Sequence, residues 1–172
     1  MTQTCSSCTG PKATIRCRRC ECALCKGCSQ RVTPDRFAFL NLSEENDLAG
    51  TYCNTCFDTS IAAEMEKYDQ TMELAKEVSV YFVDQGKETR LFKRSDNKFS
   101  VKDCADRDET IMRLAFLAAQ AGCNTLVDVD LVYAKVRDGS FKISHWTGSA
   151  TGANLDSKHR NVPTSTRRSP SR

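Results

Sequence analysis

Hydrophobic residues recur at helical spacing in one stretch of the chain, residues 58–76. Five of them follow one another at intervals of four, three, four and three residues: Ile61, Met65, Tyr68, Met72 and Ala75. This spacing places them on one face of a helix, and the Asp58-Thr-Ser60 run can supply its N-cap. The pattern predicts a single helix, whose charged positions suit an exposed connector between two domains.

Residues 77–152 show the turn signals and alternation of a small sheet domain. Val78–Val83 and Leu126–Val136 read as strands, because they are rich in β-branched and aromatic residues. A helix should begin near Asp106-Arg-Asp-Glu109 and end at Gly122, and Asp138-Gly139 should turn the chain into a return strand over Phe141–Trp146. The order strand, helix, strand, strand, with room for one more strand before the helix, predicts an α+β fold.

Within the longest strand we expect one apolar side, formed by Val127, Val129, Leu131 and Tyr133. Asp128 and Asp130 then belong to its solvent face, and His145 is a strand residue rather than a metal ligand. The two cysteines that flank the helix, Cys104 and Cys123, should be buried free thiols.

Nine of the eleven cysteines fall between Cys5 and Cys56, where aliphatic residues are few. Eight of them form four C-x2-C pairs: Cys5 and Cys8, Cys17 and Cys20, Cys25 and Cys28, Cys53 and Cys56. Each pair can direct two thiolates at one tetrahedral ion, so the spacing predicts two closed, structural Zn2+ sites per chain. The ninth cysteine, Cys22, is left over.

The flanks of these pairs carry a resemblance. The stretch Cys17-Arg-Arg-Cys20-Glu-Cys22-Ala-Leu-Cys25-Lys-Gly-Cys28-Ser29, followed by Tyr52-Cys53-Asn-Thr-Cys56-Phe57, resembles a FYVE-type zinc finger. The resemblance covers residues 1–57 and implies a treble-clef, cross-brace finger. It implies one zinc on the first and third pairs (Cys5, Cys8, Cys25, Cys28) and one on the second and fourth (Cys17, Cys20, Cys53, Cys56).

A second register competes with this one. Cys20-x-Cys22-x2-Cys25-x2-Cys28 matches the spacing of RING fingers, which act as ubiquitin ligases, and makes Cys22 a ligand in place of Cys17. Arg18, Ser29 and the aromatic Phe57 favour the FYVE register.

A basic cluster surrounds the second pair: Arg16, Arg18 and Arg19, with Lys26 and Arg31 nearby. It either contacts an anionic partner or neutralises the negative charge of two four-thiolate zinc sites. The histidines that let FYVE fingers recognise phosphatidylinositol 3-phosphate are absent around Cys17, and FYVE-related fingers of this kind generally bind proteins. We therefore expect a protein partner and only weak, salt-sensitive attraction to anionic lipid surfaces.

Residues 77–152 also resemble, more faintly, the small bacterial YbjQ-like domains. The matching pieces are Ala118-Ala-Gln-Ala-Gly122-Cys-Asn-Thr-Leu-Val127 and Thr147-Gly-Ser-Ala150. That family is described as binding heavy metals, but no ligand cluster is visible in this part of the sequence.

Charge and composition narrow the function further. The formal net charge is +3 and the isoelectric point 8.3, below that of most nucleic-acid-binding domains, and residues 153–172 read as a disordered basic tail. There is no apolar run long enough to span a membrane and no apolar signal peptide, so we expect a cytoplasmic protein, peripheral at membranes if it meets them. No nucleophile or paired-acid motif is present. The sequence predicts a non-enzymatic adaptor, with a RING-type ubiquitin ligase as the alternative.

Overall fold

The computed structural model describes residues 3–40, 48–90, 92–138 and 141–155, and the α+β class predicted from the sequence is confirmed. Internal contacts divide the chain into two compact units, Met1–Gln70 and Thr71–Arg172. The boundary lies inside a helix, within the residues that we expected to connect the two domains.

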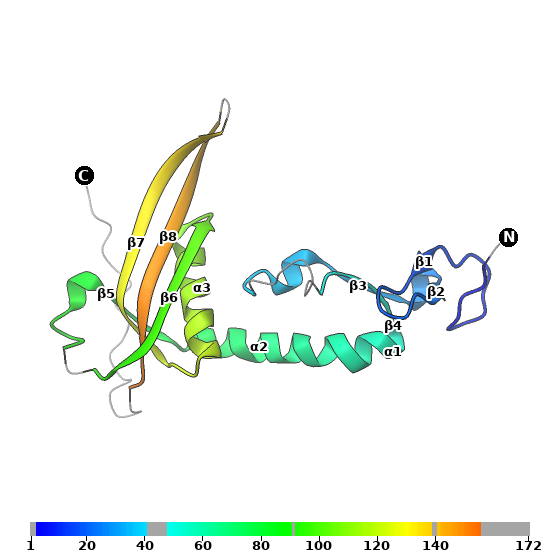
Figure 1. Cartoon of the computed structure of the whole chain (residues 1–172), viewed down its shortest axis with the longest axis horizontal. Helices are drawn as coiled ribbons and strands as arrows, with labels where there is room; N and C mark the ends of the chain where they lie inside the picture. The colour runs from blue at the N-terminus through cyan, green and yellow to red at the C-terminus, as the bar shows by residue number, and fades with distance from the viewer. Residues whose placement is uncertain (1–2, 41–47, 91, 139–140, 156–172) are drawn as a thin grey trace. The chain divides into compact units, whose positions relative to one another are not determined.

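The first unit is built from two short hairpins (Figure 1). β1 (Ile15–Arg16) pairs antiparallel with β2 (Ala23–Leu24), and β3 (Ser29–Val32) pairs antiparallel with β4 (Gly50–Cys53). Two short 3-10 helices lie between these strands, η1 (Lys26–Cys28) and η2 (Pro34–Phe37). Strands of two to four residues bury little apolar surface, so hairpins this small need another source of stability.

A helix begins directly at the last cysteine pair. Its consecutive parts are α1 (Asn54–Cys56), a π-helical turn (η4, Phe57–Ile61) and α2 (Ala62–Lys76). The predicted helix over 58–76 is confirmed, but the predicted cap in Asp58–Ser60 is wrong. Cys53 is the N-cap, because the chain enters the helix straight from the cysteine pair.

The predicted apolar stripe is the least exposed side of this helix. Ile61, Tyr68 and Ala75 are buried, and Met65 and Met72 are half-buried. In the first unit the edge of Tyr68 packs against Phe37 of η2, with ring centroids 5.5 Å apart. One helical turn of the finger thus gains an aromatic contact, which supplements its small core.

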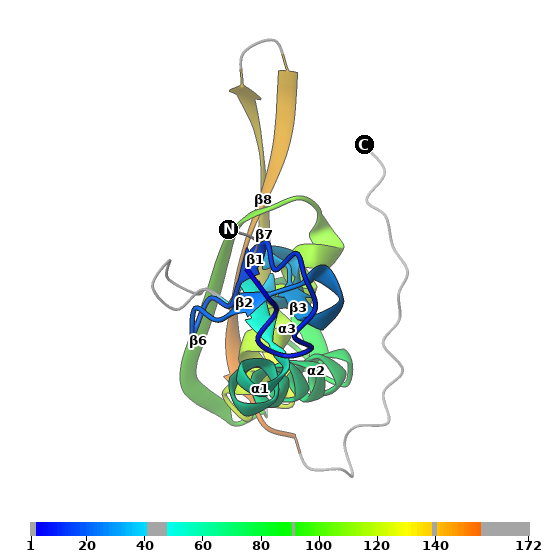
Figure 2. The same cartoon turned by 90° about the vertical axis from the view of Figure 1, so that its right-hand side faces the viewer.

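The second unit is a four-stranded sheet with one helix against it (Figure 1). Its elements are β5 (Ser79–Phe82), η5 (Val83–Gln85), β6 (Arg94–Cys104), α3 (Arg107–Gln120), β7 (Thr125–Asp138) and β8 (Phe141–Ala153). The strand order is β5-β7-β8-β6, with β5 parallel to β7 and the other neighbours antiparallel. Figure 2 shows the paired ends of β7 and β8 extending beyond α3.

Helix α3 has the predicted ends. Asp106 is the N-cap and accepts the N–H of Glu109 at 2.7 Å, while the Glu109 carboxylate accepts the N–H of Ala105 at the same distance. Gly122 follows the helix with φ +74°, a conformation that favours glycine. The predicted apolar face is also confirmed: Leu114, Ala115 and Ala118 are buried and Ile111 is half-buried.

The predicted apolar side of β7 is wrong, because a bulge interrupts the strand. Val127 pairs with Thr151 and Leu131 pairs with Gly148, so β7 spans one more residue than β8 between these pairs. Residues opposite each other share a face of the sheet, and Thr151 and Gly148 face opposite sides. Val127 and Leu131 therefore lie on different faces. The extra residue is at Asp128, with φ +53°.

Asp128 is thus not one of a row of solvent-facing aspartates. Its carboxylate accepts two hydrogen bonds from the Arg94 guanidinium of β6, at 2.8 and 3.0 Å. Arg94 holds the pKa of Asp128 below its ordinary value, since the guanidinium favours the charged carboxylate. This ion pair links the start of β6 to the bulge of β7.

Other boundaries differ by a few residues. β8 runs to Ala153, which is fully buried, so the ordered domain reaches into the range expected for the tail. The side-chain oxygen of Asn154 accepts the N–H of Asn124, which ties down the end of β8. The expected disorder of residues 156–172 and the predicted turn at Gly139 lie outside the described residues. Cys104 and Cys123 are buried, as expected.

Close packing of α3 on β8 generates the first prediction. A Cβ at Gly148 would lie 2.7 Å from Thr110 Cγ2 and 2.9 Å from Leu114 Cδ1, both on α3. Replacing Gly148 by alanine should therefore lower the free energy of unfolding by about 1–3 kcal/mol through overpacking. The matched control is Ser149→Ala, at the exposed neighbouring position, which should stay within about 0.5 kcal/mol of the wild type in urea denaturation. Equal stability of the two variants would contradict this packing.

Metal dependence of the two units generates a second prediction. The core of the second unit consists of apolar side chains such as Leu114, Phe116 and Leu126, whose burial contributes about 1.5–3 kcal/mol each. Calorimetry of the full chain should then show two unfolding transitions. A chelator should leave the transition of the second unit unchanged and remove that of the first unit. Loss of all cooperative melting in chelator would show instead that both units depend on metal.

Candidate metal centres

Four thiols of the first unit converge in one group. The Sγ atoms of Cys5, Cys8, Cys25 and Cys28 all lie within 4.8 Å of one another, and those of Cys8 and Cys25 are 3.7 Å apart. Cys5 and Cys8 come from an N-terminal loop, whereas Cys25 caps η1 after the β1–β2 hairpin and Cys28 is the last residue of η1. The structure thus joins the first pair to the third and leaves out the pair between them.

The same loop forms around the first two pairs. The N–H of Thr9 donates to the carbonyl of Cys5 at 2.8 Å, and the N–H of Glu21 donates to that of Cys17 at 2.9 Å. Thr9 and Glu21 both have φ +58° and stand four residues after the first cysteine of their pair. Each loop buries its first cysteine and exposes its second.

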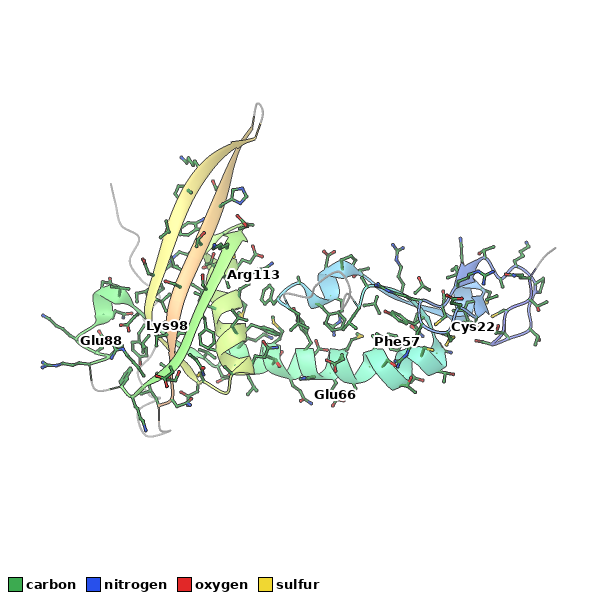
Figure 3. All side chains as sticks on the ribbon, in the orientation of Figure 1. Cys22, Phe57, Glu66, Glu88, Lys98 and Arg113 are labelled. Carbon is green, nitrogen blue, oxygen red and sulfur yellow. The ribbon has the colours of Figure 1, made fainter. Side chains whose placement is uncertain are left out.

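A second group of thiols forms between the β1–β2 hairpin and β4. The Sγ atoms of Cys17, Cys20, Cys22 and Cys53 all lie within 4.8 Å of one another, and those of Cys20 and Cys53 are 3.8 Å apart. Figure 3 shows Cys22 among the sulfur atoms of this region. The second pair therefore meets the last pair, as the first meets the third, and the leftover Cys22 joins them.

Cys56 lies beside this second group. Its N–H donates to Cys53 Sγ at 3.4 Å, and its thiol interacts with those of Cys53, Cys20 and Cys17. The structure therefore brings all eight of the paired cysteines to two places, seven of them inside the two compact groups. Sequence reasoning offered Cys22 only as a replacement for Cys17, whereas both are present in the second group.

Backbone N–H groups favour the thiolate form of Cys5 in the first group and of Cys17 and Cys20 in the second. Hydrogen bonds from the backbone of Cys25, Cys8 and Ser7 lower the pKa of Cys5 to about 6. At Cys17, burial opposes ionisation. Backbone hydrogen bonds, including one from the N–H of Cys53 at 3.4 Å, outweigh this and lower the pKa of Cys17 to about 6.

Neighbouring thiols have the opposite effect on the pKa of three other thiols. The contact with the Cys25 side chain raises the pKa of Cys28 to about 12, and that with Cys20 raises the pKa of Cys22 to about 12. The Cys53 side chain does the same to Cys56. Several thiolates this close repel one another, and a divalent cation among them would remove the repulsion and release their protons.

The spacing of the sulfurs fits a metal ion. Four sulfurs placed tetrahedrally about 2.3 Å from an ion are separated by about 3.8 Å. The separations of 3.7 Å between Cys8 and Cys25 and 3.8 Å between Cys20 and Cys53 agree with this value. The two groups could therefore hold two metal ions, each enclosed by protein sulfur.

The basic cluster lies against the second group, and two of its three arginines contact the finger itself. Arg18 donates to the carbonyl of Ala49, and its side chain packs over Gly50 at the start of β4. Arg16 donates to the carbonyl of Glu21 at 3.5 Å, while Arg19 is exposed. Arg18 thus connects the loop that carries Cys17 and Cys20 to the strand that carries Cys53.

Comparison with known proteins returned no matching family model, no significantly similar curated protein and no significantly similar solved structure.

Metal content gives the third prediction. The full chain, purified without chelator, should contain two divalent ions, and Cys8→Ser should retain one, because it removes a sulfur from the first group only. Ser7→Ala, at the adjacent exposed position, keeps its backbone N–H and should retain both ions. Elemental analysis measures all three proteins, and fewer than two ions in the wild type would contradict the assignment.

Proposed function

We propose that this protein is a non-enzymatic adaptor whose N-terminal finger is held together by two structural zinc ions. The observation that carries the proposal is that each thiol group supplies at least four sulfurs to one place. A tetrahedral ion with four protein ligands has no position for a water or a substrate, so its role is to stabilise the fold. The finger of residues 1–57, which resembles the FYVE-related fingers, would then serve as a module that recognises a protein partner.

Zinc is the ion that best suits these ligands. Thiolates are soft ligands and a tetrahedral four-sulfur arrangement is typical of zinc or of iron–sulfur sites. The first unit has only short strands and a small core, so the free energy of metal binding would supply much of its folding free energy. This agrees with a cytoplasmic protein, where the thiols stay reduced.

The second unit presents a surface suited to a protein partner. Tyr133 on β7 is 45% exposed, and its ring lies 5.2 Å from that of Trp146, its partner across the ladder on β8. Tyrosine and tryptophan are enriched at protein interfaces because they combine a large apolar area with a polar group. An adaptor of this kind would use the finger and the β7–β8 surface for different contacts.

Membrane attachment is a minor part of this proposal. Within the described parts of the chain, no helix combines the length and apolar character needed to cross a membrane. Arg16 and Arg18 are exposed, but both donate to backbone carbonyls of the finger, which occupies part of their hydrogen-bonding capacity. We expect only weak attraction to anionic lipids, lost as salt screens it over about 8 Å.

The ubiquitin-ligase alternative is favoured by one observation, the presence of Cys22 in the second thiol group. In the RING register Cys22 is a ligand, which the FYVE register does not require. Cys17 is nevertheless buried in the same group, and its Sγ accepts a backbone hydrogen bond, as expected for a ligand. We therefore place the adaptor ahead of the ligase.

One set of assays gives the fourth prediction. The zinc-loaded full chain should not accelerate transfer of ubiquitin from a conjugating enzyme that carries it as a thioester.

A photo-crosslinker at Tyr133 should capture a protein partner saturably, and Trp146→Ala should abolish the capture. The matched control carries the crosslinker at Lys98, an exposed residue of β6, and should capture nothing specific. Zinc-dependent ubiquitin transfer would establish the ligase instead, and salt-resistant binding to anionic vesicles would establish a lipid-binding finger.

A further inference from the structure

The second thiol group contains more sulfur than one tetrahedral ion can use. Four thiols lie within 4.8 Å of one another, and the thiol of Cys56 interacts with three of them. Five cysteines therefore surround one site: Cys17, Cys20, Cys22, Cys53 and Cys56. The first group has four, and the remaining two cysteines belong to the second unit.

Three of the five thiols, those of Cys17, Cys20 and Cys53, are held together by contacts of the fold. Cys17 and Cys53 are buried, and the N–H of Cys53 donates to Cys17 Sγ at 3.4 Å. Cys20 completes this trio, with its Sγ 3.8 Å from that of Cys53. These contacts join the β1–β2 loop to the N-terminus of the helix, so the trio is fixed by the fold.

The two remaining thiols reach the trio from different elements. Cys22 precedes β2, and its carbonyl accepts the N–H of Cys17 at 3.0 Å, which holds its backbone beside the loop. Cys56 lies in the first turn of the helix, with its N–H on Cys53 Sγ. Both thiols are half-buried, and each contacts the trio: Cys22 through Cys20 and Cys53, Cys56 through Cys53, Cys20 and Cys17.

We propose that the second metal centre is a five-thiol site, in which Cys22 and Cys56 alternate as the fourth ligand of one ion held by Cys17, Cys20 and Cys53. The incoming thiol gives up its proton as its sulfur bonds to the ion, and the outgoing sulfur takes a proton as its bond breaks. Cys17, Cys20, Cys53 and one of the two alternating cysteines would supply four sulfurs before and after the exchange, and no oxidant or reductant would take part. This inference rests on the metal binding in the proposed function.

The exchange has a consequence for metal lability. A fifth thiol beside a four-coordinate ion offers an associative route for ligand replacement, which the first site lacks. The second site should therefore pass its ion to a competing chelator faster than the first, and the first site serves as an internal standard within the same molecule.

The test uses the full chain loaded with Co2+, whose visible absorption distinguishes four sulfur ligands from three. Cys22→Ser and Cys56→Ser should each bind two ions with four-sulfur spectra, and the double variant should bind the second ion at least 10-fold more weakly with a three-sulfur spectrum. Loss of the four-sulfur spectrum in Cys22→Ser or in Cys56→Ser alone would overturn the proposal, because that cysteine would then be an obligatory ligand.

Alkylation of the zinc-loaded wild type tests the proposal without any substitution. Peptide mass spectrometry should find Cys22 and Cys56 each partly modified, with the trio and the first group protected. Complete modification of one and protection of the other would contradict alternation. Modification of the first group as well would instead show that the finger does not hold zinc, which is a failure of the proposed function.

Discussion

Repulsion among thiolates is the constraint on which the first unit depends. Its sulfurs approach to 3.7–3.8 Å, a separation at which several negative charges cannot remain together without a cation. The short hairpins, the two repeated loops and the helix N-terminus all serve to bring these sulfurs together. Because strands of two to four residues bury little surface, metal binding of the kind proposed would be coupled to the folding of this unit.

The second unit depends on a different physical term, the burial of apolar surface between α3 and the sheet. Gly148 lets Thr110 and Leu114 of α3 approach β8 closely, and the Arg94–Asp128 pair stabilises the bulge that redirects β7. The two units therefore respond to different conditions. Chelation should disrupt one of them, whereas changes in side-chain volume should disrupt the other.

Local signals in the sequence predicted the elements that depend on local chemistry. The C-x2-C pairs, the apolar stripe from Ile61 to Ala75 and the ends of α3 at Asp106 and Gly122 are determined by residues close together in the chain. The bulge at Asp128 could not be predicted, because an aspartate in an alternating strand ordinarily indicates a solvent face. Its conformation is explained by Arg94, which is 34 residues away. Likewise, spacing could not place Cys22 together with Cys17 and Cys53, because the distance between them depends on how the loop of β1 and β2 meets β4.

The interleaving of the thiol groups also imposes an order of events during synthesis of the chain. All four cysteines of the first group have been synthesised once Cys28 has been added, whereas the second group waits about 25 residues longer for Cys53. At ribosomal rates of about 5–20 residues per second, this interval lasts about 1–5 s. During it Cys17, Cys20 and Cys22 lack Cys53, the partner that they meet in the finished fold. Under the proposed metal binding, an ion that arrives within those seconds would meet these three thiols before their native partner exists.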